Sequence, residues 1–219
     1  ETLSKKKINY ICLFENSYPL KLKKIKNPPI ILYSIGNVEL NSEHKFLAVV
    51  GTRKVTSYGR SITSMFASEL ASQGLVIVSG LAIGVDSIAH AACLDSRGIT
   101  IAVLGNGVDI CYPRENQRVY DRIIDAGGMI LSELPPGALP NVGSFPSRNR
   151  IVAGLSDGVL VTEGASDSGS LITANFGLEF GRKVFAIPGP VTSSLSAAPL
   201  KLIEKGAKLV VTPEDVIKN

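Results

Sequence analysis

Short apolar runs alternate with longer amphipathic stretches from Phe46 onward, and Gly or Pro punctuates the joins. The apolar runs are rich in Val and Ile, which is typical of strands in a buried parallel sheet. In the first amphipathic stretch, Ile62, Phe66 and Leu70 recur at intervals of four, as one face of a helix requires. The pattern predicts strands over residues 46–50, 75–79, 100–104, 129–132, 158–162, 184–187 and 208–211, and helices over 57–72, 85–96, 114–126, 145–155, 170–180 and 200–205.

Alternation of this kind predicts an α/β fold, namely a doubly wound, mostly parallel sheet with an extended Rossmann-like architecture. We assign residues 46–219 to this domain. Residues 1–45 contain the Pro28-Pro29 break and are predicted to form a basic N-terminal extension packed on the core. No internal repeat is visible.

The positive charge of the chain is concentrated at its N-terminus. The net charge is +4, and residues 1–45 carry eight Lys against four Glu, whereas residues 46–219 carry fifteen basic and fifteen acidic side chains. Such lysines can contact phosphates or form a solvated face, and the pattern alone leaves both open. The lysines concerned are Lys5, Lys6, Lys7, Lys21, Lys23, Lys24 and Lys26.

Composition excludes several classes of protein. With 45% hydrophobic and 19% charged residues, the chain is predicted to fold around a core of its own. Cys12, Cys93 and Cys111 are widely spaced, which argues against a disulfide framework and a zinc site and favours the reducing cytoplasm. No stretch is long and apolar enough to span a bilayer, and no basic, apolar leader opens the sequence. We therefore expect no metal, no cofactor and no membrane.

In a doubly wound fold the ligand crevice lies at the carboxyl ends of the strands. Gly51-Thr52-Arg53 follows the first predicted strand but lacks the second glycine of a dinucleotide-binding turn, and Gly105-Asn106-Gly107 lacks the third. A Walker A loop is excluded because no Gly-Lys dipeptide occurs in the chain. The sequence therefore does not predict a dinucleotide or a Walker A nucleotide as the ligand of the crevice.

Several features of the crevice favour an anion. Ser168-Gly169-Ser170 precedes a predicted helix, where backbone N–H groups, two hydroxyls and the helix dipole converge, although Ser is also an ordinary N-cap. Arg53, Arg148 and Arg150 lie near predicted strand ends, and arginine binds phosphate bidentately. Phe145 offers a flat surface for a base, or a hydrophobic staple at a helix start. Together these residues predict binding of a phosphodiester backbone.

Groups suited to catalysis are few. Asp86 and His90 share one helical face and could act as an acid–base pair, but we favour a structural role for them. Cys111 is interpreted as a small buried hydrophobe. Glu133 and Glu163 follow predicted strands and are predicted to face the crevice, so a carboxylate pair for hydrolysis stays open.

The chain resembles the DprA/Smf family, the DNA-processing protein A of bacteria, from about Tyr18 to its C-terminus. Two of the matching motifs are specific to that family. The motifs that carry the resemblance are Val50-Gly51-Thr52-Arg53, Ser79-Gly80-Leu81-Ala82-x-Gly84-x-Asp86, Leu104-Gly105-x-Gly107, Tyr112-Pro113-x-x-Asn116, Ser132-Glu133-x-Pro135-x-Gly137, Val184-Phe185-Ala186-x-Pro188-Gly189, and the two specific ones, Phe145-Pro146-x-Arg148-Asn149-Arg150 and Ser168-Gly169-Ser170-Leu171-x-Thr173.

The resemblance implies a cytoplasmic protein of natural transformation that binds and protects single-stranded DNA and loads RecA recombinase onto it. It implies a homodimer without enzymatic activity or cofactor. In some relatives a SAM-like domain precedes the Rossmann core and a winged-helix domain follows it. We expect the segments on either side of the core in this chain to be too short to form these domains. The implied DNA-binding residues are Gly51, Thr52, Arg53, Asn106, Phe145, Arg148, Arg150, Ser168, Gly169, Ser170 and Thr173, and the implied dimer residues are Leu195, Leu202 and Ile203.

The chain also departs from the family pattern. Ala197-Ala198-Pro199 replaces a Gly-x-Asn of many relatives, and residues 135–144 lack the basic residue found in some. An enzymatic alternative is a phosphoribohydrolase resembling the LOG proteins, which cleave nucleotides with a Pro-Gly-Gly-x-Gly-Thr-x-x-Glu turn. Residues 163–170 lack that glycine pattern, so DNA binding is the preferred hypothesis.

Overall fold

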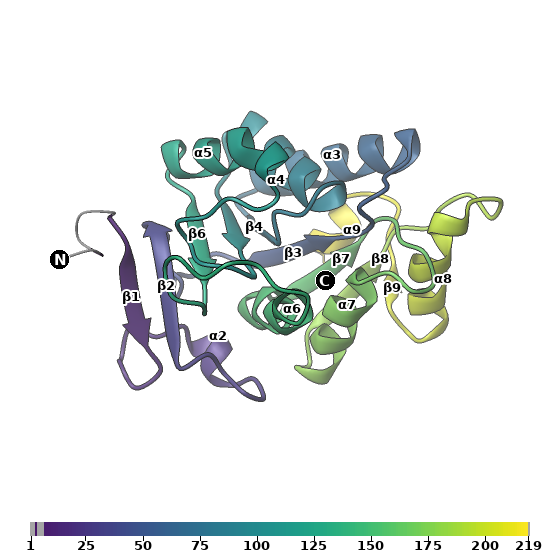
Figure 1. Ribbon diagram of the computed structural model, residues 1–219. Coiled ribbons are helices and arrows are strands. Elements are labelled where there is room, and N and C mark those ends of the chain that lie inside the picture. The colour runs from purple at the N-terminus through teal and green to yellow at the C-terminus, as the bar shows by residue number, and fades with distance from the viewer. Residues whose placement is uncertain (1–2, 4–6, 219) are drawn as a thin grey trace.

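The described residues form one continuous sheet of nine strands, covered by helices on both faces (Figure 1). The structure is a computed structural model and describes residue 3 and residues 7–218. The strand order is β1-β2-β6-β5-β4-β3-β7-β8-β9. The strands are β1 (Asn9–Cys12), β2 (Ile31–Gly36), β3 (Phe46–Val50), β4 (Val76–Ser79), β5 (Thr100–Val103), β6 (Met129–Ser132), β7 (Gly158–Val161), β8 (Lys183–Ala186) and β9 (Lys208–Leu209).

Strands β3 to β9 are all parallel, whereas β2 pairs antiparallel with both β1 and β6. This arrangement confirms the predicted doubly wound, mostly parallel α/β fold. The chain builds outward from β3 to β6 on one side and then returns to place β7 beside β3. The order of strands therefore reverses between β3 and β7, which is where a doubly wound sheet opens a ligand crevice.

Helices α3, α4 and α5 cover one face of the sheet, and α2, α6 and α7 cover the other (Figure 1). Leu202 of α8 belongs to the same hydrophobic cluster as Ile151 of α6, so α8 packs on the face that α6 covers. Val216 of α9 belongs to the same hydrophobic cluster as Phe66 of α3, so α9 packs on the opposite face. No helix of the described residues is long and apolar enough to cross a membrane. The helices are α2 (Leu20–Lys23), α3 (Ser57–Ser72), α4 (Val85–Asp95), α5 (Gln117–Asp125), α6 (Ser144–Leu155), α7 (Ser170–Glu179), α8 (Ala197–Glu204) and α9 (Glu214–Ile217), with 3-10 turns η1 (Arg114–Asn116) and η2 (Ser194–Ser196).

Every predicted strand and helix has a counterpart, with shifts at the ends. The predicted helix over 114–126 divides into η1 and α5, and α8 begins at Ala197 instead of residue 200. Strands β1 and β2 and the short helices α2 and α9 were not predicted. The two strands extend the sheet past β6, so the segment before residue 46 shares the backbone hydrogen bonds of the core.

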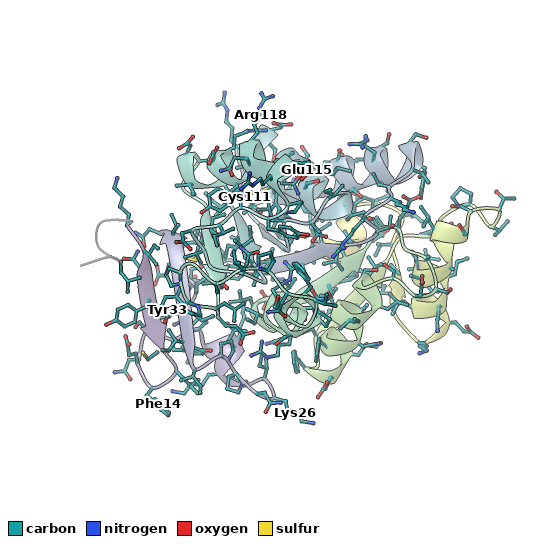
Figure 2. All side chains as sticks on the ribbon, viewed as in Figure 1. Phe14, Lys26, Tyr33, Cys111, Glu115 and Arg118 are labelled. Carbon is teal, nitrogen blue, oxygen red and sulfur yellow. The ribbon has the colours of Figure 1, made fainter. Side chains whose placement is uncertain are left out.

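The N-terminal lysines divide into two groups. Lys21 Nζ lies 2.6 Å from Asp157 Oδ2, and the same carboxylate oxygen accepts the Phe46 N–H at 2.8 Å, so Lys21 ties the N-terminal segment to β3. Lys23, Lys24 and Lys26 are exposed, and Lys26 projects away from the body of the protein (Figure 2). Residues 5 and 6 lie outside the described residues, and the boundary between residues 45 and 46 stays a prediction.

A buried carboxylate fixes the start of α3 beside the crevice. Glu163, which follows β7, is 2% exposed and accepts hydrogen bonds from the Thr56 N–H at 3.0 Å and the Thr56 hydroxyl at 2.6 Å. The Thr56 hydroxyl oxygen in turn accepts the Gly59 N–H at 3.0 Å, as an N-cap does. A Cβ at position 59 would collide with the Glu163 carboxylate, so this cap requires glycine there.

Candidate functional site

A cleft of about 630 Å³ opens at the carboxyl ends of the strands, where β3 and β7 meet. Its walls come from the loops after β3, β4 and β7 and from the starts of α6 and α7. The tertiary structure thus brings together segments that are far apart in the sequence. Of the eleven residues predicted to contact DNA, nine line the cleft: Gly51, Thr52, Arg53, Phe145, Arg148, Ser168, Gly169, Ser170 and Thr173.

Arg148 forms the charged floor of the cleft. The residue is only 5% exposed, and its Nη1 donates to the carbonyl oxygen of Val103 at the end of β5. Burial lowers the pKa of Arg148, and the nearby carboxylate of Asp86 acts in the opposite direction. Arg148 Nε has no hydrogen-bond partner among the described residues. A guanidinium that lines the cleft offers its positive charge to an anion that enters, whereas Nε itself is shielded from solvent.

The guanidinium reaches this position by passing over Gly80, just after β4. A Cβ on Gly80 would collide with the Arg148 guanidinium. The backbone N–H groups of Gly80 and Ala82 donate to Asp86 Oδ2 at 3.1 and 3.4 Å, which holds the countercharge in place. Burial nevertheless raises the pKa of Asp86, while Arg148 and these hydrogen bonds lower it.

Asp86 and His90 do not form an acid–base pair with each other. His90 is fully buried, and its Nδ1 lies 2.7 Å from Thr100 Oγ1. Because the Thr100 hydroxyl donates its proton to Ile77 O at 2.7 Å, it accepts from His90, whose Nδ1 therefore carries the hydrogen. Burial, and then the charge of Arg148, lower the pKa of His90 to about 3, so its imidazole is neutral at pH 7.

This buried imidazole predicts an acid-sensitive contribution to stability. The unfolded chain protonates His90 near pH 6.5 and the folded chain near 3, so the stabilisation is complete above 6.5 and declines as the pH falls toward 3. Between about pH 7.5 and 5.5 we expect wild type to lose about 1.4 kcal/mol relative to His90→Asn. Urea unfolding at both pH values measures this difference. Asp86 is present in both proteins, so its opposite contribution cancels, and an equal pH dependence of the two would contradict the prediction.

Two aromatic side chains form one wall of the cleft. The rings of Phe145 and Tyr112 stack with centroids 5.8 Å apart and planes 30° apart, and the guanidinium carbon of Arg53 lies 5.8 Å from the Phe145 centroid. Helix α6 begins at Ser144, so Phe145 lies inside its first turn rather than before it. The staple interpretation, which requires a residue ahead of the N-cap, is therefore wrong.

Tyr112 was not among the predicted site residues, although it is 46% exposed and lines the cleft. It lies in the loop after β5, at a carboxyl end of the sheet like the other cleft residues. An aromatic residue in such a loop was the available signal. What the sequence did not reveal is that this loop returns to place the Tyr112 ring on Phe145.

The turn before α7 offers fewer free donors than the sequence predicted. The Ser168 and Ser170 hydroxyl oxygens lie 2.8 Å apart, and Ser168 Oγ accepts the Ser170 N–H at 3.3 Å. The N–H groups of Leu171 and Ile172 already donate to the carbonyl oxygens of Ser168 and Gly169. Ligand contacts at this turn would therefore come mainly from the two serine hydroxyls and the helix dipole.

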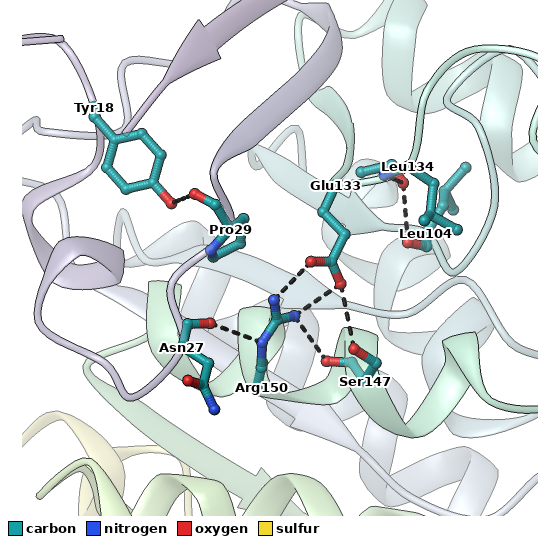
Figure 3. Close-up of polar contacts among 9 residues, drawn as sticks. Tyr18, Asn27, Pro29, Leu104, Glu133, Leu134, Ser147 and Arg150 are labelled. Atoms are coloured by element: carbon teal, nitrogen blue, oxygen red, sulfur yellow. Dashed lines mark hydrogen bonds and ion pairs between the residues drawn. The ribbon is translucent and has the colours of Figure 1, made fainter. Parts of the chain in front are cut away.

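Two residues predicted to contact DNA lie outside the cleft. Asn106 is 1% exposed, and its amide donates to Gly107 O and Ile110 O at 3.0 and 2.6 Å, so it shapes the loop after β5. Arg150 pairs instead with both carboxylate oxygens of Glu133, at 2.8 and 2.6 Å (Figure 3). Its Nε donates to the carbonyl oxygen of residue 27 at 3.0 Å, which fixes the N-terminal segment to α6.

Neither carboxylate of the pair considered for hydrolysis lines the cleft. Glu133 is neutralised by Arg150, and Glu163 is the buried partner of the α3 cap, so the prediction that both face the crevice is wrong. Cys111 is half-buried, and burial raises its pKa to about 11, which keeps the thiol protonated at neutral pH. Within the described part of the chain, no group of three or more His, Cys, Asp or Glu could hold a metal ion.

The three residues assigned to a dimer surface differ in exposure. Leu202 is 1% exposed and belongs to the core cluster, so its side chain is not available to a partner. Ile203 packs against the same cluster while staying partly exposed, and Leu195 is also partly exposed. The assignment of Leu202 to a contact surface is therefore wrong for its side chain, because α8 turns this position toward the sheet.

The chain is similar over nearly all its length to known bacterial proteins. Residues 9–219 match the family model described as DNA recombination-mediator protein A. The chain is 43% identical over 212 residues to the DNA processing protein DprA of Bacillus subtilis, covering 97% of this chain and 71% of that protein. It is 45% identical over 203 residues to the protein Smf of Escherichia coli, covering 92% of this chain and 54% of that protein.

Solved structures show the same similarity. The X-ray structure of DNA processing protein A from Streptococcus pneumoniae has a TM-score of 0.92 at 42% identity, covering all of this chain and 77% of that one. DNA processing protein A from Helicobacter pylori, solved for its single-stranded DNA binding mode, has a TM-score of 0.85 at 34% identity, covering 96% of this chain and 94% of that one. A molybdenum cofactor binding protein from Rippkaea orientalis, at 19% identity and a TM-score of 0.58, shares the fold alone.

Proposed function

Because the chain belongs to the DNA recombination-mediator protein A family, we propose that its cleft binds single-stranded DNA. The observation that carries the proposal is the composition of the cleft at the switch point between β3 and β7. Arg53 and Arg148 supply positive charge, the turn of residues 168–170 supplies hydroxyls, and a stacked aromatic pair supplies an apolar surface. A relative 34% identical to this chain was solved for its single-stranded DNA binding mode, which supports this choice of ligand.

Different parts of the cleft suit different parts of a nucleotide. A phosphate is bound between Arg53, on the rim, and Arg148, on the floor, because guanidinium groups form charge-assisted hydrogen bonds with phosphate oxygens. A base stacks on the wall of Phe145 and Tyr112, since every base has a π face and stacking tolerates any sequence. Acidic residues 86 and 167 also line the cleft, so its positive charge is local to the two arginines.

The wider role proposed for the chain is that of a cytoplasmic homodimer of natural transformation, which protects incoming DNA and loads RecA recombinase onto it. This part of the proposal rests on the family resemblance.

A titration with labelled oligo-dT at several salt concentrations tests the proposed function. Each phosphate neutralised on a single strand contributes a slope of about -0.7 to log K against log salt, so two arginines predict about -1.4 or steeper. Incubation with nucleoside monophosphates tests the phosphoribohydrolase alternative in parallel. Absence of binding at low salt would contradict the proposal, and release of free base would favour the enzyme.

Replacement of Phe145 by Ala is expected to weaken oligo-dT binding by about tenfold or more, because a stacked base contributes about 1–3 kcal/mol. The salt slope is expected to stay the same, since no charge is lost. Fluorescence anisotropy measures both quantities, and thermal unfolding checks that the fold is retained. Phe145→Tyr keeps the ring and is the matched control. A folded Phe145→Ala protein with wild-type affinity would remove the aromatic wall from the binding site.

A further inference from the structure

A second groove, of about 430 Å³, lies next to the cleft on the face of the protein formed by α6 and α7. The two depressions share Pro146 and Ile172, which form an apolar saddle between them. Ile172 is 37% exposed, so the saddle is open to solvent at that residue. The residues of the groove that matter here are Lys26, Phe176, Glu179 and Phe180.

The floor of this groove is a second stacked aromatic pair. Phe176 and Phe180 lie one turn apart at the C-terminal end of α7, with ring centroids 5.6 Å apart and planes 18° apart. Both side chains pack on the core with one part and remain partly exposed with the other. The saddle thus separates the Phe145–Tyr112 pair of the cleft from the Phe176–Phe180 pair of the groove.

The wall of the groove carries positive charge. Lys26 is exposed and projects outward from the loop after α2 (Figure 2), and two further exposed lysines, at 23 and 24, precede it in the chain. Arg150 does not add to this charge, because Glu133 neutralises it, but its hydrogen bond to Asn27 O fixes the loop that carries Lys26 (Figure 3). Glu179 is the acidic residue of the lining.

We propose that this groove is a second base-stacking subsite for the same DNA strand. The inference rests on the proposed function of the cleft. A strand that leaves the cleft crosses Pro146 and Ile172 and places a further base on Phe176 and Phe180, while Lys26 contacts the backbone. Continuity with the cleft, an aromatic floor and an adjacent lysine together match the requirements of a single strand, namely alternating contacts to bases and phosphates.

The test compares short oligo-dT, which fills the cleft alone, with a ladder of longer strands that reach the groove. Wild type is expected to bind the longer strands at least about fivefold more tightly, as one added stacked base requires. Lys26→Glu and Phe176→Leu are expected to remove this gain while leaving short-strand affinity unchanged. Glu179→Lys is expected to increase the gain. Arg118→Glu, on α5 at the opposite face of the sheet from Lys26 (Figure 2), is the matched charge control.

An abasic nucleotide moved along the longer strand separates stacking from charge. In wild type we expect affinity to fall at two separate positions, and in Phe176→Leu at only one. Lys26 is exposed, so its variant remains informative even if Phe176→Leu is found by thermal unfolding to be destabilised. A length gain that survives Lys26→Glu, or a single abasic-sensitive position in wild type, would overturn the second subsite and point to contacts elsewhere, such as a second protomer. Failure of wild type to bind short strands would instead contradict the proposed function itself.

Discussion

Replacement of Arg148 by Met is expected to weaken binding of short oligo-dT by about 30-fold or more, because removing one partner of a buried, hydrogen-bonded charge pair typically costs about 2–5 kcal/mol. The same replacement of Arg150 is expected to leave the affinity close to wild type. The two arginines lie on one helix and differ in surroundings. Arg148 lies on the floor of the cleft, and Arg150 is held outside by Glu133.

The salt dependence adds an independent measurement. Loss of one phosphate contact is expected to reduce the magnitude of the slope by about 0.7 in Arg148→Met and to leave it unchanged in Arg150→Met. Arg148→Lys retains the charge without the guanidinium, so it should preserve the slope while lowering affinity. Anisotropy titrations at several salt concentrations give both numbers for each variant.

The stability of these variants needs its own control. Arg148→Met leaves Asp86 buried without its countercharge, which is expected to destabilise the protein at neutral pH. Adding Asp86→Asn removes that charge and should restore much of the melting temperature. If the folded double variant bound short oligo-dT as tightly as wild type, Arg148 would have no part in the site.

The largest effect on stability is expected at Leu202. Leu202→Ala should lower the free energy of unfolding by about 2–5 kcal/mol, because it removes buried methyl groups and leaves a cavity in the core. Leu200→Ala, on the same helix but 38% exposed, should change it by less than about 0.5 kcal/mol. Chemical denaturation of both variants measures the difference.

Substitutions on α8 also separate an effect on the stability of the monomer from an effect on dimer formation. Sedimentation of Leu200→Arg and Ile203→Arg, whose wild-type side chains are at least partly exposed, tests the proposed dimer without disrupting the core. Leu202→Arg would not test it, because the charge would be buried and the monomer would be destabilised. Equal stability of Leu202→Ala and Leu200→Ala would contradict the position of Leu202 in the core.

Most of the parallel part of the fold was predictable from local sequence. Helix α3 is Ser57–Ser72, as the spacing of Ile62, Phe66 and Leu70 indicated, and β3 is Phe46–Val50. Such elements are readable because a continuous period or an unbroken apolar run is a local property of the chain. The two strands before residue 46 were missed, because their stability comes from pairing with β6, which lies far away in the sequence.

The candidate site was likewise predictable in part from local sequence and in part dependent on segments that are far apart in the chain. Strand ends and turn residues identified the crevice, and most of the predicted residues line it. The spacing of Arg148 and Arg150 also indicated that only one of them faces the cleft. Residues two apart on a helix point in directions that differ by about 200° around the helix axis. The sequence did not reveal which of the two faces inward, because that depends on Gly80, Asp86 and Glu133, which come from other segments.

Tertiary packing also set the roles of Asn106, Glu163 and Tyr112. Asn106 and Glu163 both follow predicted strands, yet their hydrogen bonds to the surrounding backbone and to Thr56 hold them away from the cleft. Tyr112 enters the cleft because the loop after β5 carries it onto Phe145. Local sequence thus determined which strand ends form the crevice, whereas the direction of each polar side chain depends on partners that come within hydrogen-bonding distance when the chain folds.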